Sequence, residues 1–383
     1  MKKKLIRTAT IAMSLDLLLK GQLAFFSNYF DVVAISGNDN HLENVRNREK
    51  VKTIDVAFQR KISPIKDLIS LIKLYQVLIK EKPEIIHSIT PKAGLLSMIA
   101  GYFARVPIRI HTFTGLIFPS KTGVLKILLI NLDRLLCFFA TNIIAEGNGV
   151  KKDLIANNIT HKPISIIANG NVNGIDTAYF DPRLFLEIDN NILKSKLNIL
   201  PKDFVFIFVG RLVSDKGINE LVTAFEKLSA INHDVKLLLV GDFEEKLDPL
   251  LPDTINIITS NINIISLGFQ DDVRPYFAIA SMVVFPSYRE GFPNVVLQAG
   301  AMGLPSIVTN INGCNEIITH NYNGIIIPPK NYNAVFIAMQ NICTDSKLLQ
   351  NLASKSRQNI IEKFDQSSVW NALLAEYRKF EKS

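Results

Sequence analysis

Residues 284–316 read VFPSYREGFPNVVLQAGAMGLPSIVTNINGCNE, and the order of residue types in this stretch decides the fold. The apolar residues at its start predict a buried strand, which Pro286 ends. Pro293 suits the first turn of a helix, because its missing N–H would be unpaired there. Gly303 ends that helix, and Ser306–Thr309 predicts the next strand. The result is a strand–helix–strand unit, and the amino end of its helix favours an anion.

The turn before this helix is more polar than a simple connection needs. Arg289, Glu290 and Asn294 are crowded around Gly291. Polar side chains on a loop that a rigid sheet positions are typical of a binding or catalytic site. An ordinary βαβ connection without a ligand is the alternative, since such units are common in α/β proteins.

Length and composition indicate two domains. The chain has 383 residues, of which 48% are hydrophobic, and this is too long for one ordinary core. Its three cysteines, Cys137, Cys314 and Cys343, lie far apart without metal-ligand spacing. We therefore expect reduced thiols in a cytoplasmic protein, with neither a disulfide framework nor a metal site.

Two apolar segments could be mistaken for membrane signals. The first follows Lys2–Lys4, but Arg7, Ser14 and Asp16 interrupt it, so a strand over Leu5–Met13 is the better interpretation. The second, residues 124–145, contains a lysine, an arginine and an aspartate. Neither provides the roughly 20 consecutive apolar residues that cross a bilayer, and we expect no integral membrane segment.

The net charge of +8 is unevenly distributed. Residues 1–180 hold 24 Lys and Arg against 13 Asp and Glu, whereas residues 181–383 hold 19 against 22. The basic first half indicates an anionic partner. A membrane surface and a phosphorylated lipid both qualify. Nucleic acid is the weakest of the three anionic partners and is not expected, because the chain shows no basic helix, aromatic stacking motif or zinc finger.

The first half alternates apolar strands with helices, which predicts a doubly wound parallel sheet. The helix over residues 65–80 has Leu68, Leu71, Ile72, Tyr75 and Leu78 on its apolar side. The predicted strands are 31–36, 51–56, 85–89, 108–112 and 142–145, and the other predicted helices are 93–103 and 127–139.

The second half repeats the pattern after a polar stretch. We divide the chain into a Rossmann-like domain (1–180), a linker (181–202) with a short helix over 191–197, a second Rossmann-like domain (203–365) and a final helix (366–383). Two such halves predict a cleft between them, where ligands bind. The predicted strands are 204–209, 236–240, 264–267, 282–285 and 306–309, and the helices are 218–231, 273–280 and 369–380.

A second polar cluster follows the strand over 204–209. Gly210 and Arg211 come directly after it, and Lys216 and Gly217 precede the next helix. An arginine and a lysine at the carboxyl end of a strand, near a helix amino end, suit a diphosphate. Two solvated surface cations are the alternative.

These motifs resemble the GT-B glycosyltransferases of family 4. GRLVSDKG at 210–217 and PSYREGFPNVVLQAGAMGLPSIVTNINGCNEII at 286–318 carry the resemblance over nearly the whole second half. Weaker matches in the first half are LKGQL at 19–23, HSITPKAG at 87–94, HTFTGL at 111–116 and NGNVNGID at 169–176. The resemblance implies a GT-B fold, in which residues 1–180 bind the acceptor, residues 203–365 bind the donor and the final helix packs back on the first domain. It also implies a retaining transfer from a nucleotide sugar. Bacterial members that extend polyprenyl-diphosphate-linked saccharides for capsule or O-antigen look most similar.

The resemblance also implies residue roles in the second half. Arg211 and Lys216 match the pair that neutralises the donor diphosphate, so the reaction needs no metal. Glu290 matches the first glutamate of the E-x7-E motif, which approaches the transferred sugar. Further donor contacts are expected from Gly210, Gly291, Phe292, Pro293 and Asn294, with UDP as the expected nucleotide.

Gln298 departs from the family pattern. A second glutamate is expected at this position, where its carboxylate accepts hydrogen bonds from the nucleotide ribose. A glutamine carbonyl still accepts one hydrogen bond. Because hydrogen bonds to charged groups are stronger, we expect a loss of about 1 kcal/mol in donor affinity, with activity retained.

The first half departs further, because a single glycine replaces the Gly-Gly loop of many relatives. The candidate residues there, at strand ends or in the matched segments, are Ser14, Gly21, His87, Lys92, His111 and Thr114. Lys92 is a candidate for the acceptor diphosphate. For His87 and His111 the alternative to a role in the site is a purely structural role, which is common for a lone histidine on a strand.

We therefore expect transfer of a hexose or N-acetylhexosamine from a nucleotide-diphosphate sugar to a polyprenyl-diphosphate-linked saccharide acceptor in surface-polysaccharide biosynthesis. Residues 118–139, with lysines among apolar residues, are a candidate for peripheral contact with an anionic membrane, and a core helix is the alternative. Two other functions remain open: a UDP-sugar 2-epimerase, and a non-catalytic subunit that binds sugar nucleotide, to which Gln298 points.

Overall fold

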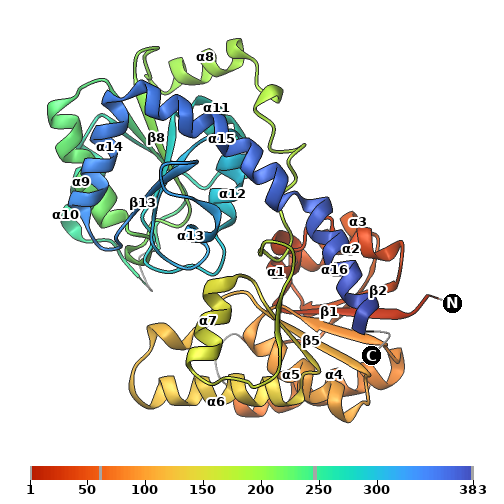
Figure 1. Cartoon of the computed structure of the whole chain (residues 1–383). Helices are drawn as coiled ribbons and strands as arrows, with labels where there is room; N and C mark the ends of the chain where they lie inside the picture. Colours follow the sequence, from red (N-terminus) through yellow and green to blue (C-terminus); the bar gives the residue numbers. More distant parts are fainter. Residues whose placement is uncertain (1, 60–62, 245–247, 381–383) are drawn as a thin grey trace. The chain divides into compact units, whose positions relative to one another are not determined.

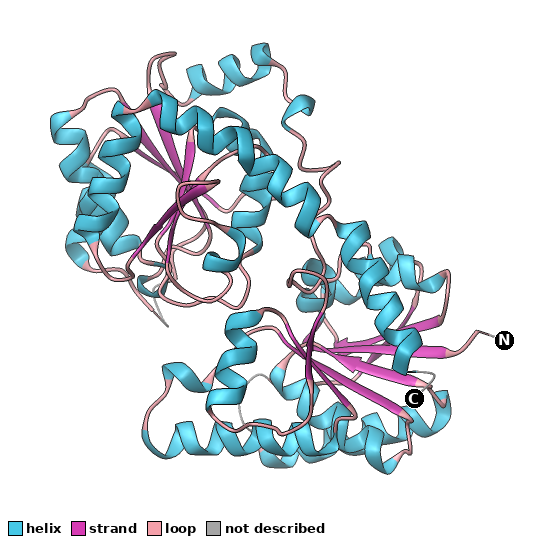
Figure 2. Cartoon of the chain, viewed as in Figure 1, coloured by secondary structure: helices cyan, strands magenta, loops and turns pink. Residues whose placement is uncertain are grey.

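The computed structural model describes residues 2–59, 63–244 and 248–380. The chain forms two compact α/β units (Figures 1 and 2). Unit 1 comprises residues 1–174 and 366–383, and unit 2 comprises residues 175–365. Each is built on a parallel sheet, so the predicted pair of doubly wound Rossmann-like domains is confirmed. Cys137, Cys314 and Cys343 are free thiols, as predicted.

Unit 1 contains a seven-stranded sheet of order β3-β2-β1-β4-β5-β6-β7. Its strands are β1 (Lys4–Ile11), β2 (Asp31–Gly37), β3 (Lys52–Asp55), β4 (Ile85–Ser88), β5 (Ile108–Phe113), β6 (Asn142–Ala145) and β7 (Ile164–Ile166). Its helices are α1 (Ala12–Leu18), α2 (Gln22–Ser27), α3 (Asn40–Glu49), α4 (Pro64–Glu81), α5 (Pro91–Phe103), η1 (Phe118–Ser120), α6 (Gly123–Phe139), α7 (Asn148–Ala156) and α16 (Gln366–Phe380).

Two apolar clusters cover the two faces of this sheet. The inner strands are mainly apolar and buried on both sides, as parallel strands between helices must be, whereas the edge strand β3 is exposed or half-buried. One cluster joins the sheet to α4, α5 and α6, which lie side by side along its lower side in Figure 1. The other joins it to α1, α2 and α16. The final helix therefore packs on unit 1, through Leu373, Leu374 and Tyr377.

Most of the residues predicted to form the apolar side of α4 do not face the core. Leu78 is buried, but Leu68, Ile72 and Tyr75 are exposed. The face that packs inward carries Ser70, Leu74, Leu78 and Glu81 instead. Glu81 is tolerated there because Lys4 and Lys52 both pair with it at 2.7 Å. The outer face of α4 is consequently an apolar stripe that no other described helix covers.

Arg7, in the middle of β1, is fully buried. Its guanidinium donates to the hydroxyl oxygen of Tyr377 at 2.8 Å, and that hydroxyl lies 2.6 Å from Nδ1 of His87. The other ring nitrogen of His87 lies 2.7 Å from Oγ1 of Thr112. Burial lowers the pKa of His87 well below its usual value, so the ring is neutral. A chain of polar contacts thus joins the last helix to three strands.

Unit 2 contains a six-stranded sheet of order β10-β9-β8-β11-β12-β13. Its strands are β8 (Phe204–Val209), β9 (Val235–Val240), β10 (Ile264–Gly268), β11 (Met282–Phe285), β12 (Ser306–Thr309) and β13 (Gly324–Ile327). Its helices are η2 (Pro182–Leu184), α8 (Glu187–Lys196), η3 (Ser214–Lys216), α9 (Ile218–Ile231), α10 (Pro252–Ser260), α11 (Arg274–Ile279), α12 (Asn294–Ala301), α13 (Cys314–Ile317), α14 (Tyr332–Thr344) and α15 (Ser346–Phe364).

The division between the units differs from the predicted linker. Residues 175–202 lie in unit 2, because Phe180, Phe185, Leu193 and Ile199 pack on its apolar core. The polar residues of this segment made it look like a linker, and its widely spaced apolar anchors carried too weak a periodicity to show the packing.

Candidate functional site

The candidate site of unit 2 lies where the strand order of its sheet changes direction. β8 has β9 on one side and β11 on the other, and helices return to the sheet on opposite faces. In open α/β sheets, ligands bind outside the carboxyl ends of the strands at this point. Gly210 and Arg211 follow β8 there, and the loop over residues 286–293 follows β11.

An ion pair between Lys216 and Glu290 lies at the centre of this site. Both side chains are largely buried, with 20% and 14% of their surfaces exposed. The hydroxyl of Ser287 donates to the same carboxylate oxygen at 2.7 Å, and Thr309 binds the carbonyl oxygen of Ser287. Glu290 is thus held by two groups, the ammonium of Lys216 and the hydroxyl of Ser287.

Close backbone contact joins the two loops that carry this pair. Gly217, with φ +72°, touches the carbonyl of Pro286, and a Cβ atom there would overlap that oxygen. The N–H of Tyr288 donates to the carbonyl oxygen of Asp215 at 2.9 Å. The glycine is therefore required both by its left-handed conformation and by the close approach.

Arg211 is placed differently from Lys216. Its side chain is 64% exposed and pairs with Glu244. Arg289, from the other loop, pairs with Asp215 at 2.8 Å. The two cations predicted to bind the diphosphate thus lie on one loop after β8, and each is neutralised by a different carboxylate. An incoming anion must compete with Glu244 and Glu290 for them.

The remaining candidates of the second half lie at the amino end of α12. Pro293 is the residue before the first helical residue, Asn294 begins the helix, and Gln298 lies one turn further. Phe292 is buried against Phe364, at 5.6 Å between ring centroids. Gly291 is contacted by Gly313, whose Cβ position would overlap the carbonyl oxygen of Gly291.

Sequence reasoning missed three residues that shape this site: Ser287, Thr309 and Gly313. Ser287 and Thr309 are polar residues at the carboxyl ends of β11 and β12, and that placement was the available signal. Gly313 has φ +74°, and no sequence pattern shows what its backbone approaches.

The two histidine candidates of unit 1 are both engaged inside the core. His87 is held by Tyr377 and Thr112, as described above. Nδ1 of His111 lies 2.8 Å from Oγ of Ser88, and its ring lies against Gly94. Burial lowers the pKa of His111 to about 3, so this ring is also neutral. Thr114, half-buried, donates its hydroxyl to the carbonyl oxygen of Ile89 at 2.9 Å.

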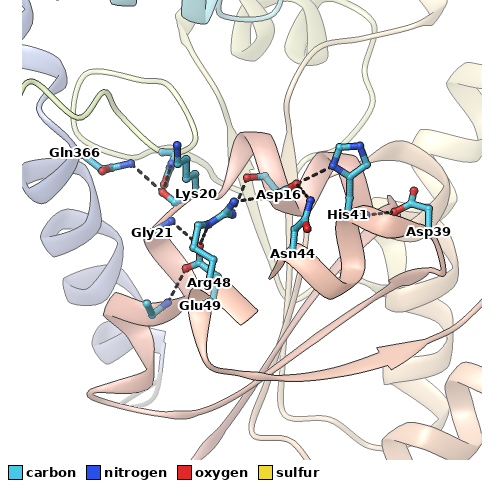
Figure 3. A network of polar contacts seen from close by, with 11 residues as sticks. Asp16, Lys20, Gly21, Asp39, His41, Asn44, Arg48, Glu49 and Gln366 are labelled. Carbon is cyan, nitrogen blue, oxygen red and sulfur yellow. Dashed lines mark hydrogen bonds and ion pairs between the residues drawn. The ribbon is translucent and has the colours of Figure 1, made fainter. Parts of the chain in front are cut away.

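Gly21 belongs to a polar network that anchors α1 and α2 (Figure 3). Its N–H donates to Glu49 at 2.8 Å, and Glu49 also accepts from the N–H of Ala24. A Cβ atom on Gly21, which has φ +81°, would lie 2.8 Å from the ring of Trp370. The position therefore needs glycine for the helix start and for the packing of α16.

The same network holds Asp16, the last polar residue of α1. Burial favours the neutral acid, but hydrogen bonds from His41, Arg48 and Asn44 outweigh it and lower the pKa of Asp16. Figure 3 shows these side chains converging on the carboxylate from α3. These contacts between Asp16 and α3 hold α1, the helix that follows β1, in place.

Ser14 and Lys92 line a cavity in unit 1 of about 400 Å³. It lies at the carboxyl ends of β1 and β4, where the strand order of this sheet changes direction, and between α5 and α6. Lys92 pairs with Asp67 at 2.8 Å on its rim. Most of its wall is apolar, but Asp133 of α6 also contributes.

The buried carboxyl group of Asp133 should make the stability of the protein depend on pH. Burial raises its pKa to about 7, from 3.8 for an ordinary aspartate. Between these values the folded protein keeps a proton that the unfolded chain releases, so this group lowers the stability as the pH rises. We expect Asp133→Asn to gain stability over the parent by about 2 kcal/mol more at pH 8 than at pH 5.

Urea unfolding followed by the fluorescence of Trp370, the single tryptophan of the chain, measures this difference. Asp55→Asn, at an exposed position of β3 in the same unit, is the matched control. A gain for Asp133→Asn that is the same at both pH values would contradict the prediction.

Comparison with known proteins agrees with this architecture. The family model "Glycosyltransferase Family 4" matches residues 28–177, and "Glycosyl transferases group 1" matches residues 189–359. The capsular polysaccharide biosynthesis glycosyltransferase CapM of Staphylococcus aureus is 30% identical over 381 residues, covering 99% of this chain and 97% of CapM. An Escherichia coli UDP-Gal:alpha-D-GlcNAc-diphosphoundecaprenol alpha-1,3-galactosyltransferase is 32% identical, covering 80% of this chain and 78% of that enzyme.

The solved structure of HepE from Anabaena in complex with UDP has the same fold. Its TM-score is 0.82 at 19% identity, with 99% of this chain and 100% of HepE covered. The two Rossmann-like units with parallel sheets, together with the similarity to these relatives, identify the protein as a GT-B glycosyltransferase. The chain belongs to family 4 of these enzymes, as the motifs of its second half predicted.

Proposed function

We propose that this enzyme transfers a hexose or N-acetylhexosamine, with retention of configuration, from a UDP-sugar to a polyprenyl-diphosphate-linked saccharide. The reaction would serve bacterial surface-polysaccharide synthesis at the cytoplasmic side of the membrane. The Lys216–Glu290 pair at the carboxyl ends of β8 and β11 carries the proposal. The names of the Staphylococcus and Escherichia relatives, and the UDP bound to HepE, support the choice of donor and acceptor.

The proposed reaction breaks the bond between C1 of the sugar and the diphosphate oxygen. A bond from C1 to an acceptor hydroxyl oxygen replaces it, the proton of that hydroxyl passes to the departing diphosphate oxygen, and UDP leaves. Lys216 and Arg211 would stabilise the charge that develops on the leaving diphosphate, which requires no metal. As the diphosphate takes over Lys216, the carboxylate of Glu290 becomes available to the sugar.

A donor panel tests the proposal. The purified enzyme is incubated with single radiolabelled UDP- and GDP-sugars and with lipid extract that contains diphosphoundecaprenol-linked saccharides. We expect label in the lipid fraction with one UDP-sugar, unchanged by EDTA, and an axial C1 configuration in the product. Label in free sugar nucleotide only, or a product of inverted configuration, would contradict it.

Gln298 motivates a second candidate, a subunit that binds sugar nucleotide without transferring it. The variant Gln298→Glu separates the two. For an active enzyme we expect about tenfold tighter UDP-sugar binding, because a carboxylate accepts stronger hydrogen bonds than an amide, and little change in turnover. Calorimetry and initial rates measure both. Turnover that appears only in the variant would favour the non-catalytic subunit.

We also propose that unit 1 contacts an anionic membrane through the outer faces of α4 and α6. Within the described residues, no helix is long and apolar enough to cross a bilayer. Apolar side chains mixed with lysines are typical of helices that lie on a membrane surface. The exposed apolar residues are Ile65, Leu68, Ile69, Ile72, Tyr75 and Ile79 of α4 and Val124, Leu125, Ile127, Leu128, Leu135 and Phe138 of α6.

Flotation with phosphatidylglycerol vesicles tests this contact. We expect the protein to float at low salt, and less of it at high salt, because screening weakens the attraction of the lysines. Ile72→Glu, in the middle of the α4 stripe, should reduce flotation. Protein that stays at the bottom of the gradient at both salt concentrations would remove the proposal.

A further inference from the structure

The cavity between α5 and α6 has a strongly apolar wall. Its volume of about 400 Å³ falls within the roughly 300–1,000 Å³ typical of small-molecule sites. Filling such a cavity with an apolar ligand is favourable, since the wall gains dispersion contacts and the ligand leaves water. The apolar wall includes Leu95 and Leu96 of α5, Leu129, Leu132 and Leu136 of α6, Phe113 at the end of β5, and Leu116 and Ile117 after it.

The rim of the cavity is polar and carries a cation. The hydroxyls of Thr10 and Thr90, at the ends of β1 and β4, are hydrogen-bonded at 2.8 Å, and Ser14 lies beside them. Lys92, in the first turn of α5, also lines the cavity, and its ammonium group pairs with the carboxylate of Asp67 at 2.8 Å. The amino end of α5, a helix of 13 residues, adds a partial positive charge.

This combination excludes most ligand classes. A free saccharide would leave its hydroxyls against leucine side chains, where they lose the hydrogen bonds they make in water. A purely apolar molecule would leave the polar rim unused. A molecule with an anionic head and a branched apolar tail matches both parts, since its head can share Lys92 with Asp67 while its tail packs between α5 and α6.

We propose that this cavity binds the first isoprene units of a polyprenyl diphosphate, with the diphosphate at the rim formed by Lys92 and Thr90. The inference rests on the proposed function, in which the acceptor is lipid-linked. The cavity holds a short part of such a chain. The rest continues past Leu128 and Leu125, the exposed neighbours of the wall residues along α6, towards the surface that we propose contacts the membrane.

Farnesyl diphosphate is a water-soluble probe for this site. Titration calorimetry on the full chain should show saturable binding more than about tenfold tighter than that of inorganic diphosphate, because the tail buries apolar surface. Farnesol, which lacks the head, should also bind more weakly than farnesyl diphosphate. Equal affinity for farnesyl diphosphate and inorganic diphosphate would overturn the proposal.

A pair of variants on α6 locates the binding. Leu132→Trp fills the cavity and should abolish the advantage of the farnesyl tail. Asn131→Trp adds the same side chain at an exposed position of α6 that does not line the cavity, and should leave it intact. Thermal unfolding shows whether both fold. A photoactivatable farnesyl diphosphate on the parent protein gives independent mapping: label within residues 113–117 or 129–136 supports the site, and label confined to α4 overturns it.

Transfer assays separate this inference from the proposed function. Acceptors with the same saccharide diphosphate and either a farnesyl or a short alkyl tail are compared. Transfer with the same KM for both tails would overturn the cavity site and leave the proposed function standing. Saturable farnesyl diphosphate binding that Leu132→Trp abolishes, without transfer to any acceptor, would support the site and refute the function.

Discussion

Lys216→Ala is expected to reduce sugar transfer by about 10²–10³-fold and to weaken UDP binding, because one of the two cations that we propose stabilise the leaving diphosphate is lost. The effect is enlarged by Glu290. The side chain of Glu290 is only 14% exposed. In the variant its carboxylate would have no ion-pair partner and would keep only the hydrogen bond from Ser287. An unpaired carboxylate at this place repels the diphosphate.

Initial rates and calorimetry with UDP measure the two effects separately. Lys202→Ala is the matched control, since Lys202 is a lysine of the same unit that pairs with Asp234 on the surface. We expect the control to behave like the parent, as exposed ion pairs contribute little. If Lys216→Ala and Lys202→Ala gave the same rates, the placement of the diphosphate at Lys216 would be wrong.

Tyr377→Phe is expected to destabilise unit 1 by about 3 kcal/mol, although it removes a single oxygen atom. The lost hydroxyl is the hydrogen-bond partner of the fully buried Arg7 and of His87. Nε and the second terminal nitrogen of Arg7 already have no hydrogen-bond partner among the described residues. The variant would therefore leave a buried cation without compensation, which costs more than a neutral hydrogen bond.

Urea unfolding followed by Trp370 fluorescence reports on this unit, because Trp370 lies on α16 and contacts Phe25. Tyr322→Phe, at an exposed position of unit 2, is the control. In an Arg7→Met background the effect of Tyr377→Phe should shrink, since an apolar side chain needs no partner. An unchanged effect in that background would show that Arg7 is not its source.

The secondary structure of both units was largely predictable, because runs of apolar residues bounded by glycine, proline and polar residues are local signals. Ile85–Ser88 and Met282–Phe285 are strands close to the positions predicted for them. Elements with weaker patterns were missed, such as α14 and the β13 strand, whose residues 324–327 follow a polar turn.

The candidate site was predictable in part. The motifs around Lys216 and Glu290 place both residues at the carboxyl ends of neighbouring strands, and the structure brings them into contact. That they neutralise each other could not be predicted, since it depends on the approach of two loops 74 residues apart. His87 was predicted as a site candidate, but its hydrogen bonds with Tyr377 and Thr112 hold it in the core, and neither partner is close to it in sequence.

The family, the two parallel sheets and the loops that carry the candidate donor residues can be predicted from local sequence, because each depends on neighbouring residues along the chain. The packing of the folded chain sets which side of α4 faces the core, which groups neutralise Arg211 and Lys216, and that Arg7 meets Tyr377 across 370 positions. It also decided that leucines of α5 and α6 leave a cavity. Burial and pairing depend on packing between distant segments, and no local pattern encodes that packing.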